Sequence, residues 1–470
     1  MAMPTNPILS YARSRQSAAF GDQRLEKRGA QLYEALSQHR TTSIRAISRD
    51  RAEQMGDYRW LGNDEVTLDE VIESLRVDCQ GHLEGRHVLA ISDSSEINLQ
   101  AHQGRLQPEG VGVVGNNHDV GFFIHPTLVV ESETGLPLGL STVQVWHRPA
   151  ERASKAERHY KCQPIEAKES YKWIKSAQGS EAVFEAGGVA QVTYMGDSES
   201  DIYEPWFQIP QTNRHLLVRA CRDRLLSDCE ASLFEHLAAQ PVLGTYTIDL
   251  LADPRVHREA RSATLSVRTT PVHLKRPTRL GEDYPAEVRV YAVEAVELNP
   301  PDGVEPVHWR LLTTHAVTTY EQAWSIIQWY RWRWHIEQLF AILKRRGLDI
   351  EASQLESVTA LQKLTVLALA VALQVLQLTL GRDHPEAEAT VVLNLQQQAC
   401  LEQLAPSLNG RTRKQQNPHP RFSLAWAAWL IARLGGWSGY QSQRPPGIVT
   451  FYRGLQTFEG IFLGWKLAHP

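Results

Sequence analysis

Cysteine is scarce in this chain of 470 residues, and the five cysteines follow no metal-binding pattern. No CxxC pair and no zinc-like spacing occurs, which excludes the common zinc modules. The odd number of cysteines, together with the absence of a signal-peptide pattern at the N-terminus, predicts a reduced, cytoplasmic protein.

Long uninterrupted apolar runs are also lacking. The most apolar segment, residues 364–380, contains Gln374 and Gln377 and is short for a membrane span, so we expect a buried helix and no membrane partner. There is no low-complexity tract and no internal repeat. With 42% hydrophobic and 22% charged residues, the composition is typical of a well-packed globular protein. A mass of 53.1 kDa predicts two or three domains.

Strong net charge is absent as well, but the formal charge of −4 hides local basic regions. Residues 1–60 hold ten Lys and Arg against six Asp and Glu, and residues 255–280 hold seven against Glu259 alone. Such regions are candidates for phosphate contacts, and a solvated surface is the alternative for each. Residues 1–75 are predicted to form a small helical DNA-binding domain, with a plain helical cap as its alternative. The candidate DNA contacts are Arg24, Lys27, Arg28, Arg255, Arg258 and Arg261.

Residues 76–370 are expected to form an α/β domain. The apolar run of residues 86–95 (RHVLAISDSS) predicts a buried strand ending at Asp93, and residues 121–146 predict a β-hairpin. Residues 187–201 predict a further strand ending at Asp197, and residues 215–221 another. This order is that of a ribonuclease-H-like sheet. A β-strand insertion is expected at about residues 240–315, and residues 371–470 are predicted to form a helical C-terminal dimerisation domain.

The stretch YRWRWHIEQLFAILK, residues 330–344, has a single carboxylate, Glu337, among several bases. At about 100° per residue, Tyr330, Arg333, Glu337 and Lys344 share one stripe of a helix, about 60° wide. An i,i+4 ion pair between Arg333 and Glu337 explains one pair, not the stripe. Carboxylates at two strand ends and on a helix, Asp93, Asp197 and Glu337, can hold two hard divalent cations for phosphodiester chemistry.

With these residues in view, the sequence resembles the DDE transposases of the insertion-sequence-four family, in its Tn-five-like branch. The resemblance rests on VLAISDSS around Asp93, YMGDSESDIY around Asp197 and the stripe from Tyr330 to Lys344. Further similar segments are FGDQRLEKR, MGDYRWLGN, VHWRLLTT, ARLGGW and PPGIVTFYRGL, so it extends over nearly the whole chain. In the second block, Ser198 and Ser200 replace an arginine and an alanine that the family usually has.

The resemblance implies a cut-and-paste transposase that binds terminal inverted repeats and target DNA, as a homodimer on double-stranded DNA. Asp93, Asp197 and Glu337 would be catalytic and would bind two Mg²⁺ or Mn²⁺ ions. Tyr330, Arg333 and Lys344 would contact the terminal strand. Trp309 would stack on a flipped base if a hairpin intermediate forms, and a core role is its alternative.

Two other functions stay open at this point. The first is a ribonuclease-H-like endonuclease that cuts DNA without joining it. The second is a catalytically silent DNA-binding descendant, although such a protein has no chemical reason to keep all three acids.

Overall fold

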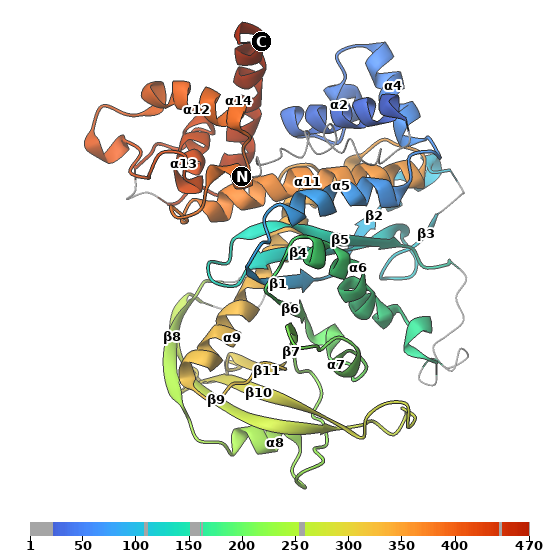
Figure 1. Ribbon diagram of the computed structural model, residues 1–470, viewed down its shortest axis with the longest axis vertical. Helices are drawn as coiled ribbons and strands as arrows, with labels where there is room; N and C mark the ends of the chain where they lie inside the picture. The colour runs from blue at the N-terminus through green and yellow to red at the C-terminus, as the bar shows by residue number, and fades with distance from the viewer. Residues whose placement is uncertain are drawn as a thin grey trace.

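The computed structural model describes residues 22–107, 111–150, 160, 163–252, 259–440 and 444–469. Within them the fold is a mixed α/β structure with one large sheet and helical regions at both ends of the chain, which confirms the predicted α/β class (Figure 1). The N-terminal helices are α2 (Gln23–His39), α3 (Ile44–Ile47), α4 (Arg51–Leu61) and α5 (Leu68–Gln80).

The central part of the sheet has the strand order β5-β4-β1-β6-β7. Strand β4 is antiparallel to both β1 and β5, whereas β6 is parallel to β1 and β7 is parallel to β6. The bounds are β1 (His87–Ser92), β2 (Ser95–Asn98), β3 (Gly112–Val113), β4 (Val120–Glu131), β5 (Pro137–Trp146), β6 (Gln191–Gly196) and β7 (Arg214–Arg219).

Strand β1 is apolar on both sides because both faces of the sheet are covered. Leu89 and Ile91 belong to the hydrophobic cluster that includes the N- and C-terminal helices, and Val88 and Ala90 belong to a second cluster on the opposite face. Side chains alternate along a strand, so a buried central strand reads as a continuous apolar run. The first acid after that run, Asp93, therefore marks the strand's end.

The second half of the sheet extends from β7 through β11, β10 and β9 to β8. These strands fall within the predicted insertion, and β11 pairs antiparallel with β7, which joins them to the central strands. The bounds are β8 (Gly244–Leu250), β9 (Arg261–Lys275), β10 (Glu287–Glu297) and β11 (His308–Thr313). The helices between the strands are α6 (Lys172–Ala186), α7 (Pro205–Gln208) and α8 (Leu233–Ala238).

The predicted helix across residues 330–344 is divided at Arg333. Helix α9 (Tyr320–Trp332) begins at a capping box formed by Thr319 and Gln322, and α10 (Trp334–Lys344) follows after one residue. The hairpin turn between β4 and β5 packs against this region, because Gly135 has φ +78° and leaves room for the Trp332 ring where a Cβ would stand.

Helix α11 (Val358–Gly381) is the apolar helix predicted from residues 364–380. It crosses the middle of the molecule beside α5, with α2 and α4 next to one half of it and the C-terminal helices next to the other (Figure 1). It is long and apolar enough to cross a membrane, but 83% of its most apolar window is buried against the protein. The remaining helices are α12 (Leu395–Leu408), α13 (Leu424–Leu434) and α14 (Ile448–Ala468).

Candidate active site

Asp93 and Asp197 lie at the same level of the sheet, at the carboxyl ends of two adjacent parallel strands. Ile91 pairs with Met195 in the β1–β6 register, and continuing that register by two residues places Asp93 beside Asp197. Adjacent strands are about 4.8 Å apart. The two acids are therefore neighbours through backbone pairing, although 104 residues separate them in the sequence.

Backbone amides orient each of the two aspartates. Asp93 Oδ1 accepts a hydrogen bond from the N–H of Ser94 at 2.7 Å. Asp197 caps the short helix η5 (Ser198–Ser200), where its Oδ1 accepts from the N–H of Glu199 at 2.8 Å. Both aspartates thus keep their second carboxylate oxygen for another partner.

Arg333 connects Asp93 with the third predicted acid. Its Nη1 lies 2.7 Å from Asp93 Oδ2 and 3.7 Å from Glu337 Oε1. The i,i+4 pair with Glu337 exists, but the shorter contact is to Asp93, so helix propensity alone does not explain the position of Arg333. The side chains of Arg333 and Asp93 are 12% and 14% exposed, whereas that of Glu337 is 41% exposed.

The pKa of Asp93 reflects its burial and the charged groups around it. The pKa of Asp93 is raised to about 6, first by burial and then by the neighbouring carboxylates of Asp197 and Glu337, against the opposing effects of Arg333 and the Ser94 N–H. Arg333 contacts Asp93 and Glu337, and the strand register places Asp197 beside Asp93, so the three predicted catalytic acids lie in one region of the molecule.

The three acids have the donor chemistry that hard divalent cations require, namely carboxylate oxygens, and at Asp93 burial and like charge make an uncompensated carboxylate costly. Among the described residues, however, no group of three or more His, Cys, Asp or Glu side chains is arranged to hold a metal ion. Beside two of the acids stands the guanidinium of Arg333, in contact with Asp93 and near Glu337. The three acids fit a metal by type, while the cation that two of them, Asp93 and Glu337, contact here is Arg333.

Tyr330 lies beneath Arg333 and is only 7% exposed. Its ring packs edge-on against Trp309 of β11, with 6.2 Å between the ring centroids. Burial, partly offset by the nearby Arg333 and Arg219, raises the pKa of Tyr330 to about 12. The two aromatic residues predicted to contact DNA are thus brought together, and Tyr330 lies next to Arg333.

Arg219 is a residue of this region that the sequence reasoning missed. It is the exposed last residue of β7, and the β6–β7 register, in which Gly196 pairs with Val218, places it beside Asp197. The signal was present in the sequence, because HLLVRAC ends a strand with an arginine at the same level as the acid that ends the strand before it.

Lys344, the last residue of the predicted stripe, is engaged elsewhere. Its Nζ donates to the carbonyl of Glu96 at 2.7 Å and lies 3.0 Å from Glu351 Oε1. Glu351 also accepts from the backbone N–H of Asn98. Lys344 therefore fastens the end of α10 to β2 in this structure, next to the strand end that carries Asp93.

The other candidate DNA contacts differ in whether their charged groups are exposed or already paired with a carboxylate. Arg24 and Lys27 are exposed on α2, whereas Arg28 lies 3.6 Å from the buried carboxylate of Asp57. Arg261 forms a two-point ion pair with the buried Glu297, with Nη2 3.0 Å from Oε2. Arg255 and Arg258 lie outside the described residues.

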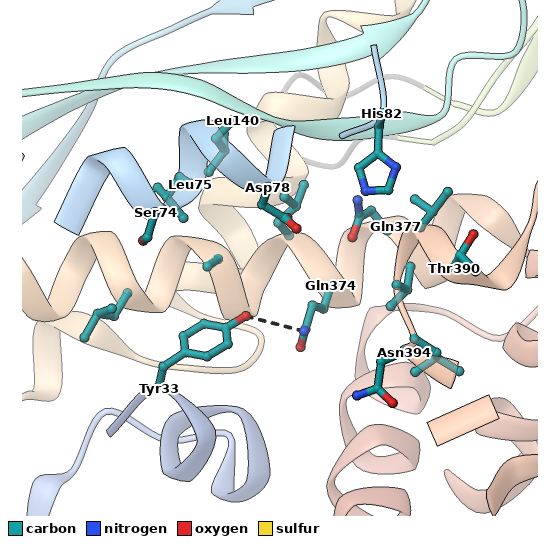
Figure 2. A pocket seen from close by; sticks show the side chains of 16 residues that line it. Tyr33, Ser74, Leu75, Asp78, His82, Leu140, Gln374, Gln377, Thr390 and Asn394 are labelled. Atoms are coloured by element: carbon teal, nitrogen blue, oxygen red, sulfur yellow. Dashed lines mark hydrogen bonds between the residues drawn. The ribbon is translucent and has the colours of Figure 1, made fainter. Parts of the chain in front are cut away.

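An enclosed pocket of about 40 Å³ lies apart from the carboxylates, between α2, α5 and α11 (Figure 2). Gln374 donates to the Tyr33 hydroxyl at 3.4 Å, and Asp78 stands in the pocket's lining, where burial raises the pKa of its carboxyl to about 7. None of the predicted catalytic residues lines this pocket.

Comparison with known proteins adds one family match. Residues 11–66 match the model of the transposase DNA-binding family. The described part of this segment comprises α2, α3 and α4, within the region predicted to bind DNA. The chain thus carries a transposase DNA-binding domain, which supports a DNA transposase.

Among solved structures, the chain is similar to the piggyBac transposase in a cryo-EM structure of its synaptic complex with hairpin DNA. The two share 9% identity over 93% of this chain and 78% of that chain, with a TM-score of 0.35. At that score the likeness carries no argument about function.

Proposed function

We propose that this protein is a DDE transposase of the insertion-sequence-four type, which cuts its element out of DNA and joins the 3′-hydroxyl ends to a target. The observation that carries the proposal is the convergence of Asp93, Asp197 and Glu337 around Arg333 at the carboxyl ends of β1 and β6. The match of residues 11–66 to a transposase DNA-binding family supports the same reading.

The strand arrangement supports a ribonuclease-H-like catalytic core. In that fold three antiparallel strands are followed by two strands parallel to the first, and the order β5-β4-β1-β6-β7 has these directions. Active-site residues of open α/β sheets gather at the carboxyl ends of strands. Asp93 and Asp197 occupy such ends.

In the proposed mechanism, Asp93, Asp197 and Glu337 would hold two Mg²⁺ or Mn²⁺ ions. When bound, the ions supply an activated nucleophile and stabilise the oxygen that leaves the phosphodiester. The chain's own cations would position the substrate, because arginine binds phosphate through two parallel hydrogen bonds. Arg333 and Arg219 would bind the phosphates nearest the acids. Lys344 would contact the strand beyond them after leaving the Glu96 carbonyl and Glu351, which bind it in this structure.

The domain at residues 1–75 would recognise the terminal inverted repeats, and the C-terminal helices would pair two protein–DNA complexes. Trp309 would stack on an extruded base if the reaction passes through a hairpin. Most of the affinity for DNA would come from phosphate contacts and would therefore fall with salt.

The proposal is tested with purified protein, Mg²⁺ and a labelled duplex that carries the DNA bracketing the gene's element. Cleavage at the element boundary should disappear in Asp93→Asn, Asp197→Asn and Glu337→Gln, and should persist in Gln338→Ala, which changes the adjacent residue of α10. Loss of about 10³-fold or more is expected for each acid, since each would be a metal ligand.

The products separate the proposal from its alternatives. Transfer of the cut ends into a target plasmid is expected of a transposase, and cleavage without transfer would indicate an endonuclease. Binding of the duplex with both strands left whole would indicate a DNA-binding protein without catalytic activity. Cleavage that survives Glu337→Gln would place the active site elsewhere.

A further inference from the structure

Arg333 presents a single cationic nitrogen to two of the three acids. The same atom, Nη1, lies 2.7 Å from Asp93 Oδ2 and 3.7 Å from Glu337 Oε1. Bridging two carboxylates from different elements is what a divalent cation would do at this site. The guanidinium thus stands where a shared cation would reduce the repulsion between them.

The surroundings hold Arg333 in this position. Its side chain is 12% exposed, and its guanidinium carbon lies 6.0 Å from the Tyr330 ring centroid and 5.8 Å from that of Trp334. Lys344 does not neutralise Asp93 or Glu337, because its ammonium is bound to the Glu96 carbonyl and Glu351. Among the contacts of the described residues, the ion pairs of Asp93 and Glu337 are with Arg333.

We infer that Arg333 is a built-in substitute for the metal in the DNA-free protein, and that DNA binding opens the metal site by drawing Arg333 onto a phosphate. The inference rests on the proposed function and describes how metal binding at that same site would be regulated. A phosphate offers the guanidinium two oxygens in a matching geometry, so it competes directly with Asp93 for Arg333. Once Arg333 has moved, the carboxylates are uncompensated and bind divalent cations more tightly.

Such coupling is reciprocal. If DNA raises the affinity of the site for metal by some factor, metal raises the affinity for DNA by the same factor. The protein alone would bind metal weakly, which keeps a phosphodiester-cleaving site inactive until an element end is in place.

The experiment measures Mn²⁺ binding to the full-length protein without DNA, from the electron paramagnetic resonance signal of the free ion. Arg333→Gln removes the competing charge and should bind Mn²⁺ about tenfold more tightly than the original chain. Arg333→Lys keeps the charge and should stay close to the original affinity. Arg331→Gln is the matched control, because it removes an exposed arginine of α9 that contacts Gln328 and should leave the affinity unchanged.

A second titration adds a pre-cleaved duplex that ends at the element boundary, corrected for Mn²⁺ bound by the duplex alone. The affinity of the original chain should rise toward that of Arg333→Gln, and Arg333→Gln should gain little. In both titrations, introducing Asp93→Asn into each protein should abolish the tight Mn²⁺ binding. That loss would assign the Mn²⁺ site to the predicted acids.

The outcomes distinguish the inference from the function on which it rests. Equal Mn²⁺ affinity in Arg333→Gln and the original chain, with binding that Asp93→Asn abolishes, would overturn the role of Arg333 and leave the metal site intact. No binding sensitive to Asp93→Asn in any variant would overturn the proposed metal site itself. Circular dichroism melting of each variant verifies that the compared proteins are folded.

Discussion

The carboxylate of Asp201 is buried against Arg224, with Oδ1 3.2 Å from Nε, and its Oδ2 accepts from the backbone N–H of Cys221 at 2.9 Å. These contacts tie the turn that follows Asp197 to the chain that leaves β7. We expect Asp201→Asn to lower the free energy of unfolding by about 2–4 kcal/mol, because a buried cation loses its charge partner. Urea denaturation measures the loss.

Glu199→Gln is the matched control for Asp201→Asn. The Glu199 side chain is 70% exposed and pairs with Lys172 at 3.2 Å, so its removal should change stability by less than about 0.5 kcal/mol. If the two variants lose equal stability, Asp201 does not anchor the turn.

Asp78 should make the protein less stable as pH rises. Its pKa is raised from 3.8 to about 7 by burial, so the folded state keeps a proton that the unfolded state releases. Stability is therefore greatest below the ordinary pKa and falls as pH rises to about 7. Asp78→Asn should reduce the slope of unfolding free energy between pH 5 and pH 7 by up to about 1.4 kcal/mol per pH unit.

The measurement is urea denaturation at several pH values, with Glu73→Gln as the control on the same helix. Glu73 is 48% exposed and pairs with Arg76, so the slope should not change. Glu459, whose pKa burial also raises to about 7, and Asp93 and Asp57, whose pKa values burial raises to about 6, should contribute to the slope that remains. An unchanged slope in Asp78→Asn would show that Asp78 ionises normally.

Lys363 should fasten α4 to α11. Its buried Nζ donates to the carbonyls of Leu61 at 3.1 Å and Asn63 at 2.8 Å. Lys363→Met keeps the length of the side chain but removes both donors, which should cost about 2–3 kcal/mol. Faster hydrogen exchange across residues 51–61 reports the local effect, and Gln362→Met, at the adjacent and less buried position, should leave it unchanged.

The salt dependence of DNA binding should separate free cations from paired ones. Lys27→Ala removes an exposed charge of the transposase DNA-binding segment and should lower the slope of log K against log salt by about one. Arg261→Ala breaks the pair with Glu297 and should leave the slope unchanged while lowering stability. Fluorescence anisotropy across a salt series measures both, and equal slopes would contradict the distinction.

The sequence was informative where backbone pairing determines position. Strands β1 and β6 were predictable because an apolar run buried on both faces ends at its first acid, and parallel pairing then brings Asp93 and Asp197 to one level. The antiparallel strands β8 to β11 were predicted from their β-type sequence pattern instead, because β8 and β9 mix buried and exposed residues and form no run buried on both faces.

Side-chain partners were not predictable in the same way. Arg333 lies 240 residues from Asp93 in sequence, and the helical stripe predicted its face but not its contact. Lys344 shares that stripe, yet Glu351 and the Glu96 carbonyl bind it. Arg261 was predicted to be a free cation because its partner, Glu297, stands at the far end of the next strand, 36 residues further along the sequence. The partner of a long side chain depends on which residues lie near it in the folded structure. The spacing of residues along one helix or strand does not predict those neighbours.

The pairing of β7 with β11 has a mechanical consequence. Three residue pairs, from Leu311–Arg219 to Thr313–Leu217, make the inserted strands and the strands that end in Asp93 and Asp197 parts of one hydrogen-bonded plate. An insertion attached in this way cannot swing as a lid on a hinge. If the protein cuts DNA as proposed, a nucleotide stacked on Trp309 would be held at a fixed offset from the acids, and the plate would set where the strand is cut.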